Sequence, residues 1–187
     1  YVIHELVQPE TLEEAYSVLT ARPDSTVLGG GAYLRLGSRQ IGTAIDLSGL
    51  KLDFINELAD GIAIGAMTTL RQIELHPVFQ SYFNGVLSLA AGQIMGVQFR
   101  NIATAGGSVY GKYGFSDFIT PLLALDAEVE LFKGGRMTLE QFLDSPGSKD
   151  ILTRILLKKS QTQAVYLNLR NSATDYSVLN VTAARDG

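Results

Sequence analysis

The sequence predicts an α+β fold, and three features of the chain indicate it. Short strand-like runs alternate with short helical patterns along the whole length. The 187 residues are 46% hydrophobic and 18% charged, so the chain can bury a core and wholesale disorder is excluded. No internal repeat or low-complexity linker interrupts the pattern, and the length fits one domain or two small ones.

The first part of the chain is expected to fold as strands around short helices. Residues 1–7 alternate loosely and predict a strand, and Thr11 with Glu14 forms a capping box that opens a helix. A second capping box, Thr69 with Gln72, opens another helix that ends at His76 and Pro77. Further short strands are expected at residues 25–28, 43–47, 52–56 and 61–65.

The longest helical pattern lies in the middle of the chain. Apolar residues recur at spacings of three and four from Val78 to about Gly96, which predicts one long helix. Pro121 fits the first turn of a later helix over 119–125, and Gly134 with Gly135 predicts a hairpin turn. The remaining elements are a short helix at 139–143 and strands at 127–132, 150–159, 164–170 and 176–184.

Composition excludes several classes of function. The net charge of −4 argues against nucleic-acid binding, which needs a basic face. Because the chain has no cysteine, it can carry no disulfide, no thiolate nucleophile and no cysteine-ligated iron–sulfur cluster. Its two histidines are too few for a histidine-based metal site, and His76 is interpreted as a helix-end residue. We find neither a membrane-spanning apolar run nor a secretion signal, and expect a cytoplasmic location.

The 19 glycines concentrate in two clusters, and the first follows a predicted strand. Glycine at positions 29 to 31 allows positive φ and removes the Cβ that would keep an anion away from backbone N–H groups. The cluster is not the dinucleotide fingerprint, because Leu34 stands where that pattern needs glycine. A phosphate-binding loop and a tight turn between two strands both remain open from the triplet alone.

The second cluster combines Thr104 with Gly106 and Gly107. Its hydroxyl and amides suit a pyrophosphate, and Asp117, about ten residues later, suits ribose hydroxyls. The alternative for Asp117 is that it caps the following helix. The same segment matches a nucleotide-binding P-loop in part, but Tyr113 replaces the serine or threonine that would bind Mg²⁺. Two such loops could clamp one dinucleotide between them.

At this point the chain resembles a known family. Residues 27–34 resemble the A-G-G-T-D-L loop of the FAD-binding subunits of molybdenum hydroxylases, such as xanthine dehydrogenase and carbon monoxide dehydrogenase. Residues 100–108 are similar to the R-N-x-A-T-x-G-G-N signature of that family, and Ser116-Asp117 falls where its S-P-x-S-D ends. Residues 64–69 and 122–129 resemble its I-G-A-x-T-T and L-L-A-L-D-A-x-V segments. The resemblance extends over nearly the whole chain.

The resemblance implies the p-cresol methylhydroxylase-type FAD-binding fold, with two α+β lobes and the flavin between them. It assigns residues 1–56 to the N-terminal lobe and residues 57–175 to the second lobe. Residues 176–187 are then the start of a C-terminal domain, which is otherwise absent from the sequence.

The resemblance also implies the function: a flavoprotein subunit of a xanthine dehydrogenase-like oxidoreductase. Electrons from a molybdopterin centre would pass through iron–sulfur clusters to FAD and then to an external acceptor. The absence of cysteine agrees with clusters and molybdenum on an iron–sulfur subunit and a molybdopterin subunit, as partners. No catalytic side chain is expected, because the flavin carries the chemistry.

The FAD contacts are carried over residue by residue. The first loop and Thr104, Gly106 and Gly107 would meet the pyrophosphate from the two lobes, and Asp117 would bind the adenosine side. The residues implied are Leu28, Gly29, Gly30, Gly31, Ala32, Tyr33, Thr104, Gly106, Gly107 and Asp117.

Several positions depart from the family pattern. Ala32 replaces a threonine, Tyr33 an acidic residue and Ser108 an asparagine, so contacts to FAD are lost. Gly114 stands where the family has proline. Near Asn168 the family places a basic residue close to the flavin, and the resemblance fixes that position here only to within one residue. The alternative function is therefore a cofactor-free scaffold of the same fold that only binds partner subunits. A stand-alone flavin reductase would need a catalytic acid, and the sequence offers no candidate.

Overall fold

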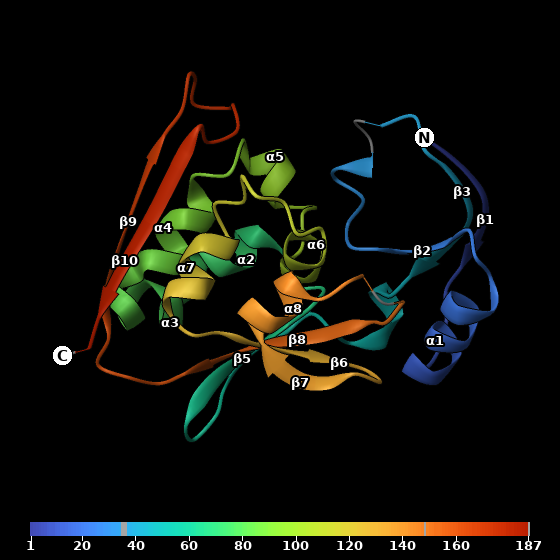
Figure 1. The fold of residues 1–187 in the computed structure, drawn as a ribbon, viewed down its shortest axis with the longest axis horizontal. Helices are drawn as coiled ribbons and strands as arrows, with labels where there is room; N and C mark the ends of the chain where they lie inside the picture. Colours follow the sequence, from blue (N-terminus) through green and yellow to red (C-terminus); the bar gives the residue numbers. More distant parts are fainter. Residues whose placement is uncertain (35–36, 148, 187) are drawn as a thin grey trace.

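The structure is a computed structural model that describes residues 1–34, 37–147 and 149–186. Helices and strands alternate along it, which confirms the α+β class. Figure 1 shows a small N-terminal sheet with one helix, a larger sheet beside it, a group of short helices above that sheet, and a two-stranded ribbon at the opposite edge. The candidate site lies between the N-terminal sheet and the helices, so their contacts decide its shape.

The N-terminal sheet is parallel, with β3 in the centre between β1 and β2. Helix α1 begins as expected at Thr11, whose side chain accepts a hydrogen bond from the N–H of Glu14 at 3.1 Å. Ala15 and Ile45 are fully buried between the helix and the sheet. The elements are β1 Val2–Val7, α1 Leu12–Ala21, β2 Ser25–Leu28 and β3 Gln40–Asp46.

The larger sheet has five antiparallel strands in the order β4-β5-β8-β6-β7. All residues of β5 are buried, and Ile62, Ile64 and Ile155 join the main hydrophobic core. The predicted hairpin at Gly134 and Gly135 is confirmed, since it joins β6 to β7. The strands are β4 Ile55–Glu57, β5 Gly61–Gly65, β6 Glu128–Leu131, β7 Gly135–Thr138 and β8 Leu152–Lys158.

Short helices cover one side of this sheet. The capping box predicted at Thr69 and Gln72 is confirmed, and an equivalent box at Thr138 and Gln141 opens the last helix. The helices are α2 Leu70–Leu75, α3 Pro77–Ser81, α4 Val86–Gly92, α5 Val97–Arg100, α6 Ala105–Tyr110, α7 Ile119–Ala124 and α8 Leu139–Asp144, with 3-10 turns η2 Ser48–Leu50 and η3 Tyr82–Gly85.

The single long helix predicted from Val78 to Gly96 is wrong. The segment is α3, the 3-10 turn and α4, because Phe83 and Asn84 both adopt positive φ (56°) and Gly85 follows at 73°. Phe83 is nevertheless buried in the same core as the helices on either side. The apolar spacing therefore reflects one shared core and not one continuous helix.

The ribbon of β9 (Gln163–Leu169) and β10 (Leu179–Arg185) closes the helical side of the molecule (Figure 1). One face packs on the helices and buries Ala164 and Tyr166. The opposite face is exposed and apolar, with Val165, Leu167, Leu169, Leu179 and Val181. Within the described ranges, no helix is both long and apolar enough to cross a membrane. The division into lobes at residues 56 and 175 stays a prediction.

Candidate functional site

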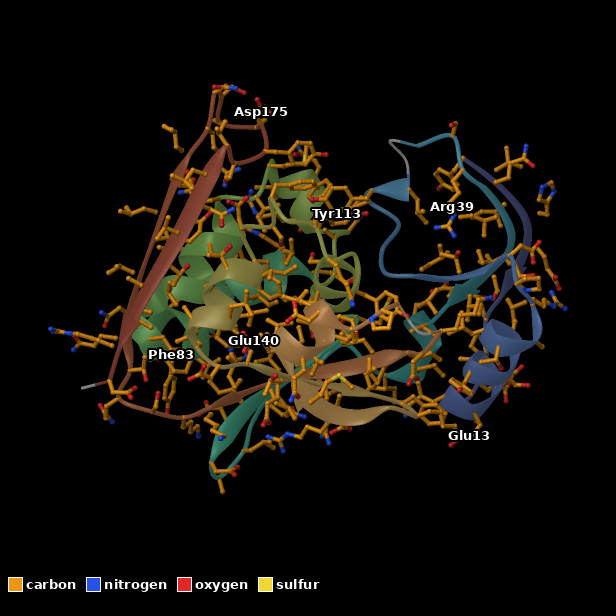
Figure 2. The ribbon with its side chains drawn as sticks, in the orientation of Figure 1. Glu13, Arg39, Phe83, Tyr113, Glu140 and Asp175 are labelled. Carbon is orange, nitrogen blue, oxygen red and sulfur yellow. The ribbon has the colours of Figure 1, made fainter. Side chains whose placement is uncertain are left out.

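A cavity of about 410 Å³ lies where the N-terminal sheet meets the segment around α6. Its walls come from the loop after β2, from residues 103–113 and from the start of β8 at residues 150–152. Arg39 and Tyr113 both line it, and Figure 2 shows Arg39 on the side of the N-terminal sheet and Tyr113 on the side of the helices. The cavity is therefore formed by segments far apart in the sequence.

The two glycine clusters pack directly against each other at one wall of this cavity. A Cβ on Gly29 would lie 2.8 Å from the Cα of Gly107, and a Cβ on Gly107 would lie 2.8 Å from the carbonyl oxygen of Gly29. Thr104 is buried at the same contact. Any larger residue would push the loops apart, so these glycines bring together the loops that the sequence predicted to share one ligand.

The first loop leaves backbone donors at the cavity. Gly30 adopts φ +78° and is so close to Ile102 that a Cβ would fall 1.6 Å from the Ile102 carbonyl oxygen. Gly31, at φ +68°, has open space where a Cβ would be, and it lines the cavity with Ala32. In the described part of the chain, the N–H groups of Gly31 and Ala32 donate no hydrogen bond. An anion in the cavity could accept from them.

The second loop uses its N–H groups within the chain. Gly106 donates to the carbonyl of Ala66 at 2.8 Å, and Gly107 donates to Oγ1 of Thr104 at 3.1 Å. Thr104 is the N-cap of α6. In this structure the second loop therefore supplies close packing and a wall of the cavity, while the free amides are in the first loop.

Asp117 lies away from this cavity, buried against the ribbon. Its carboxylate accepts from the hydroxyls of Tyr166 and Ser177 and lies 2.9 Å from Nη2 of Arg170. It does not cap α7, as the alternative prediction had it, because the N–H of Ile119 donates to Ser116 Oγ instead. Burial, and then donation to Asp117, raise the pKa of Tyr166 to about 12.

An aromatic cluster separates Asp117 from the large cavity. We define it as Tyr33, Phe99, Tyr113, Phe115 and Tyr176. The ring centroids of Tyr33 and Tyr113 are 4.7 Å apart, and those of Phe115 and Tyr176 are 4.4 Å apart. Burial raises the pKa of Tyr33 to about 12, with the nearby Tyr176, Tyr113 and Asp117 adding to the effect. Tyr33 therefore stays a neutral phenol at ordinary pH.

The predicted site residues divide into two groups. Those that line the large cavity together are Gly29, Gly31, Ala32, Tyr33, Thr104, Gly106 and Gly107. Leu28 ends β2 in register with Asp46, Gly30 packs on Ile102, and Asp117 lines a second, smaller cavity. Ser108 lines both cavities.

Sequence reasoning missed Arg39 and the role of Tyr113 with Phe115. Arg39 follows the glycine loop at the start of β3, where nothing in the local pattern marks it. The Tyr113-Gly-Phe115 spacing just before Asp117 was a usable signal, since it places two rings beside a predicted ligand contact. Lys112 does not reach the cavity: its ammonium donates to the carbonyls of Phe142 (2.5 Å) and Ser145 (2.8 Å), unlike a P-loop lysine.

Comparison with known proteins identifies relatives. Residues 3–159 match the family described as "FAD binding domain in molybdopterin dehydrogenase". The chain is 32% identical over 173 residues to the nicotinate dehydrogenase FAD-subunit of Eubacterium barkeri, covering 83% of this chain and 58% of that protein. It is 32% identical over 127 residues to the putative xanthine dehydrogenase FAD-binding subunit XdhB of Escherichia coli K12, covering 65% of this chain and 43% of that protein. The chain thus spans about half the length of these curated relatives.

A solved structure shares the fold. A chain of carbon monoxide dehydrogenase from Hydrogenophaga pseudoflava superposes with a TM-score of 0.85 at 24% identity, over 94% of this chain and 67% of that chain. At this identity the likeness concerns the fold alone. It confirms the fold that the resemblance implied.

Proposed function

Since this chain belongs to the family of FAD-binding domains in molybdopterin dehydrogenases, we propose that it is an electron-transfer subunit that binds one FAD. Electrons from iron–sulfur clusters on a partner would reach an external acceptor through this FAD. When bound, FAD supplies both one- and two-electron transfer. The observation that carries the proposal is the direct packing of Gly29 on Gly107 at the wall of a cavity of about 410 Å³.

The residues around the cavity suit a dinucleotide. The free N–H groups of Gly31 and Ala32 would receive the pyrophosphate, and the absence of a Cβ at Gly31 leaves room for its oxygens. Gly106 and Gly107 would act through the wall that they form, because their N–H groups are bonded within the chain. Arg39 is the cation on the opposite rim in the described part of the chain, and it would balance phosphate charge.

The partners are proposed from the name of a relative and from the composition of this chain. A relative that is 32% identical over 173 residues is named as the FAD-subunit of nicotinate dehydrogenase, and the word subunit implies further chains. Because this sequence contains no cysteine, it cannot ligate an iron–sulfur cluster through thiolates. We therefore propose an iron–sulfur subunit and a molybdopterin subunit as its partners, with the substrate bound by the latter.

Titration with FAD tests the proposal directly. The purified chain is expected to bind FAD in one-to-one stoichiometry, measured by calorimetry and by the flavin absorption bands of the complex after gel filtration. Gly31→Asn provides the matched variant, since asparagine tolerates the φ of +68° and places a side chain in the open space beside the free amides, so FAD affinity should fall while the fold is kept. A preparation that takes up no FAD would contradict the proposal.

A second candidate function is supported by Ala32 and by Asp117. Ala32 brings no hydroxyl to the cavity, and Asp117 is fully engaged with Tyr166, Ser177 and Arg170. These features favour a scaffold of the same fold that binds partner subunits without FAD. This candidate predicts that Ala32→Thr with Tyr33→Asp raises a weak FAD affinity severalfold, because each restored hydrogen bond contributes about 0.5–3 kcal/mol. An unchanged dissociation constant would count against it.

A further inference from the structure

The two cavities of the molecule meet at a pair of tyrosines. The large cavity of about 410 Å³ contains the glycine loops, and a second cavity of about 20 Å³ contains Asp117 and Arg170. Tyr33 and Tyr113 line both. The second cavity holds about one water molecule, so a ligand ring could lie only on the large-cavity side of these two side chains.

We propose that Tyr33 and Tyr113 form the stacking surface for the isoalloxazine ring of FAD, an inference that rests on the proposed function. Tyr33 is fixed for this role by its neighbours. Its ring meets the edge of Phe99 at a centroid distance of 5.5 Å and an angle of 81°, and it lies nearly parallel to Tyr176 at 6.4 Å and 19°. These contacts set the orientation of the Tyr33 ring where it lines the large cavity.

The position of the pair relative to the phosphate end supports the assignment. Gly31, Ala32 and Tyr33 are consecutive, so the free amides and the aromatic surface belong to one loop. Tyr113 approaches from the segment after α6, far from Tyr33 in the sequence (Figure 2). A ligand whose pyrophosphate lies at the amides can thus place one of its two rings on the tyrosines.

The electronic character of the pair favours isoalloxazine over adenine. Both phenol side chains line the large cavity, and burial keeps Tyr33 protonated. A neutral phenol is electron-rich, and an electron-poor flavin ring stacks favourably on it.

The stacking assignment and the cofactor-free scaffold make opposite predictions for position 33. An aspartate there would remove the aromatic contact and place a negative charge at the large cavity. The double variant Ala32→Thr with Tyr33→Asp should therefore weaken FAD binding, whereas the scaffold candidate predicts that it raises a weak affinity. One titration with FAD separates the two.

Binding of FAD, riboflavin and ADP to the whole chain tests the inference by calorimetry and flavin fluorescence. Tyr113→Leu and Tyr33→Leu should each raise the dissociation constant for riboflavin between about twofold and tenfold and leave that for ADP unchanged. Tyr113→Phe should keep the affinity but restore part of the flavin fluorescence that the phenol quenches. Tyr82→Leu is the matched control, because Tyr82 is also partly buried beside a phenylalanine (5.8 Å) but does not line either cavity.

The outcomes separate the inference from the proposed function. If FAD and ADP bind and the leucine variants leave riboflavin binding and fluorescence unchanged, the stacking assignment is overturned and the FAD proposal stands. If the leucine variants weaken ADP and spare riboflavin, the tyrosines hold adenine and the assignment is overturned. If the wild-type chain binds neither FAD nor ADP, both fail. Circular dichroism of each variant confirms that the fold is kept.

Discussion

Arg100 Nε lies 2.8 Å from Glu74 Oε2, and this ion pair joins α5 to the end of α2. Nη1 of the same guanidinium donates to the carbonyls of Ile94 (3.0 Å) and Met95 (2.9 Å). Met95 has φ +47°, a strained conformation that this contact helps to hold. Arg100 begins the R-N-x-A-T-x-G-G pattern, and its contacts indicate that it supports the loop from behind the cavity.

Replacing this arginine should destabilise the chain strongly. In Arg100→Met, the carbonyls of Ile94 and Met95 lose their donor and Glu74 loses a nearly buried partner. Removing one member of a buried ion pair costs about 3–5 kcal/mol. We expect a loss of that size in the free energy of unfolding, measured by urea denaturation followed by circular dichroism. A loss below about 1 kcal/mol would show that the contact contributes little.

The partner carboxylate gives this contact a pH dependence. Burial acts to raise the pKa of Glu74, but hydrogen bonds from Arg71 and Arg100 outweigh it and hold the pKa below its usual value of 4.5. The stability it contributes is therefore full above about pH 4.5 and is lost as the pH falls through the lower, folded value. Glu74→Gln should be less stable than wild type at pH 7, and the difference should shrink toward pH 3.

A matched control for the pH series is Glu13→Gln, since Glu13 lies exposed on α1 (Figure 2). Urea midpoints for both variants and wild type would be measured from pH 3 to pH 7. At pH 7 the Glu13 variant should lose much less stability than Glu74→Gln, because Glu13 is exposed and lies only in the first turn of α1. A constant difference between Glu74→Gln and wild type across this range would contradict the pH dependence.

Much of the fold could be predicted from local sequence, because caps and turns act over a few residues. Thr69 with Gln72 and the Gly134-Gly135 hairpin are such local signals, and the structure confirms them. The break at Phe83 could not be predicted in this way, since a phenylalanine at φ +56° is disfavoured locally. Burial of its ring in the core stabilises what the backbone alone would avoid.

The candidate site was predictable in its parts and not in its contacts. The two glycine loops were recognisable in the sequence. Only the structure shows that the N–H groups of Gly106 and Gly107 donate hydrogen bonds to Ala66 and Thr104. Likewise, the hydroxyl partners of Asp117 lie on β9 and in the loop between β9 and β10, 49 and 60 residues further along the chain. Contacts of such long range leave no local pattern, so a carboxylate in a loop looks the same whether free or engaged.

A side chain placed at the contact between the two glycine loops should lower both the stability of the chain and its affinity for FAD. In Gly107→Ala, the new Cβ would meet the carbonyl oxygen of Gly29 at 2.8 Å, which forces the loops apart. Overpacking of this kind costs about 1–3 kcal/mol. We expect the unfolding free energy to fall by that amount and FAD affinity to fall at least tenfold, measured by urea denaturation and calorimetry.

Gly147→Ala is the matched control for the loop variant. Gly147 is exposed, and nothing lies within 4 Å of the position of its Cβ. Its stability and FAD affinity should therefore stay within the error of the wild-type values. Equal losses in both variants would mean that the loss of glycine itself, and not the contact with Gly29, is responsible.

Alkaline titration should reveal the buried tyrosines. Burial and donation to Asp117 raise the pKa of Tyr166 from 10.0 to about 12. A raised folded pKa means that the folded state holds the proton more tightly, so this contribution is full below about pH 10 and is lost as the pH rises through about 12. Tyr33 titrates over the same window, because burial raises its pKa to about 12 as well.

Tyr166→Phe isolates one of the two groups. At pH 8 this variant should be less stable by about 1.5–3 kcal/mol, since Asp117 loses a hydroxyl donor to a charged group. Between pH 10 and pH 12 the free energy of unfolding of the wild type should fall more steeply with pH than that of the variant, so that the two curves converge. Urea denaturation at fixed pH values measures this.

Tyr33→Phe should reduce the slope of the unfolding free energy in the same pH window without the loss at pH 8, because the Tyr33 hydroxyl makes no hydrogen bond within the described residues. Parallel curves for wild type and Tyr166→Phe up to pH 12 would show that the phenol of Tyr166 ionises with equal ease in the folded and unfolded chain, and would contradict its buried contact with Asp117.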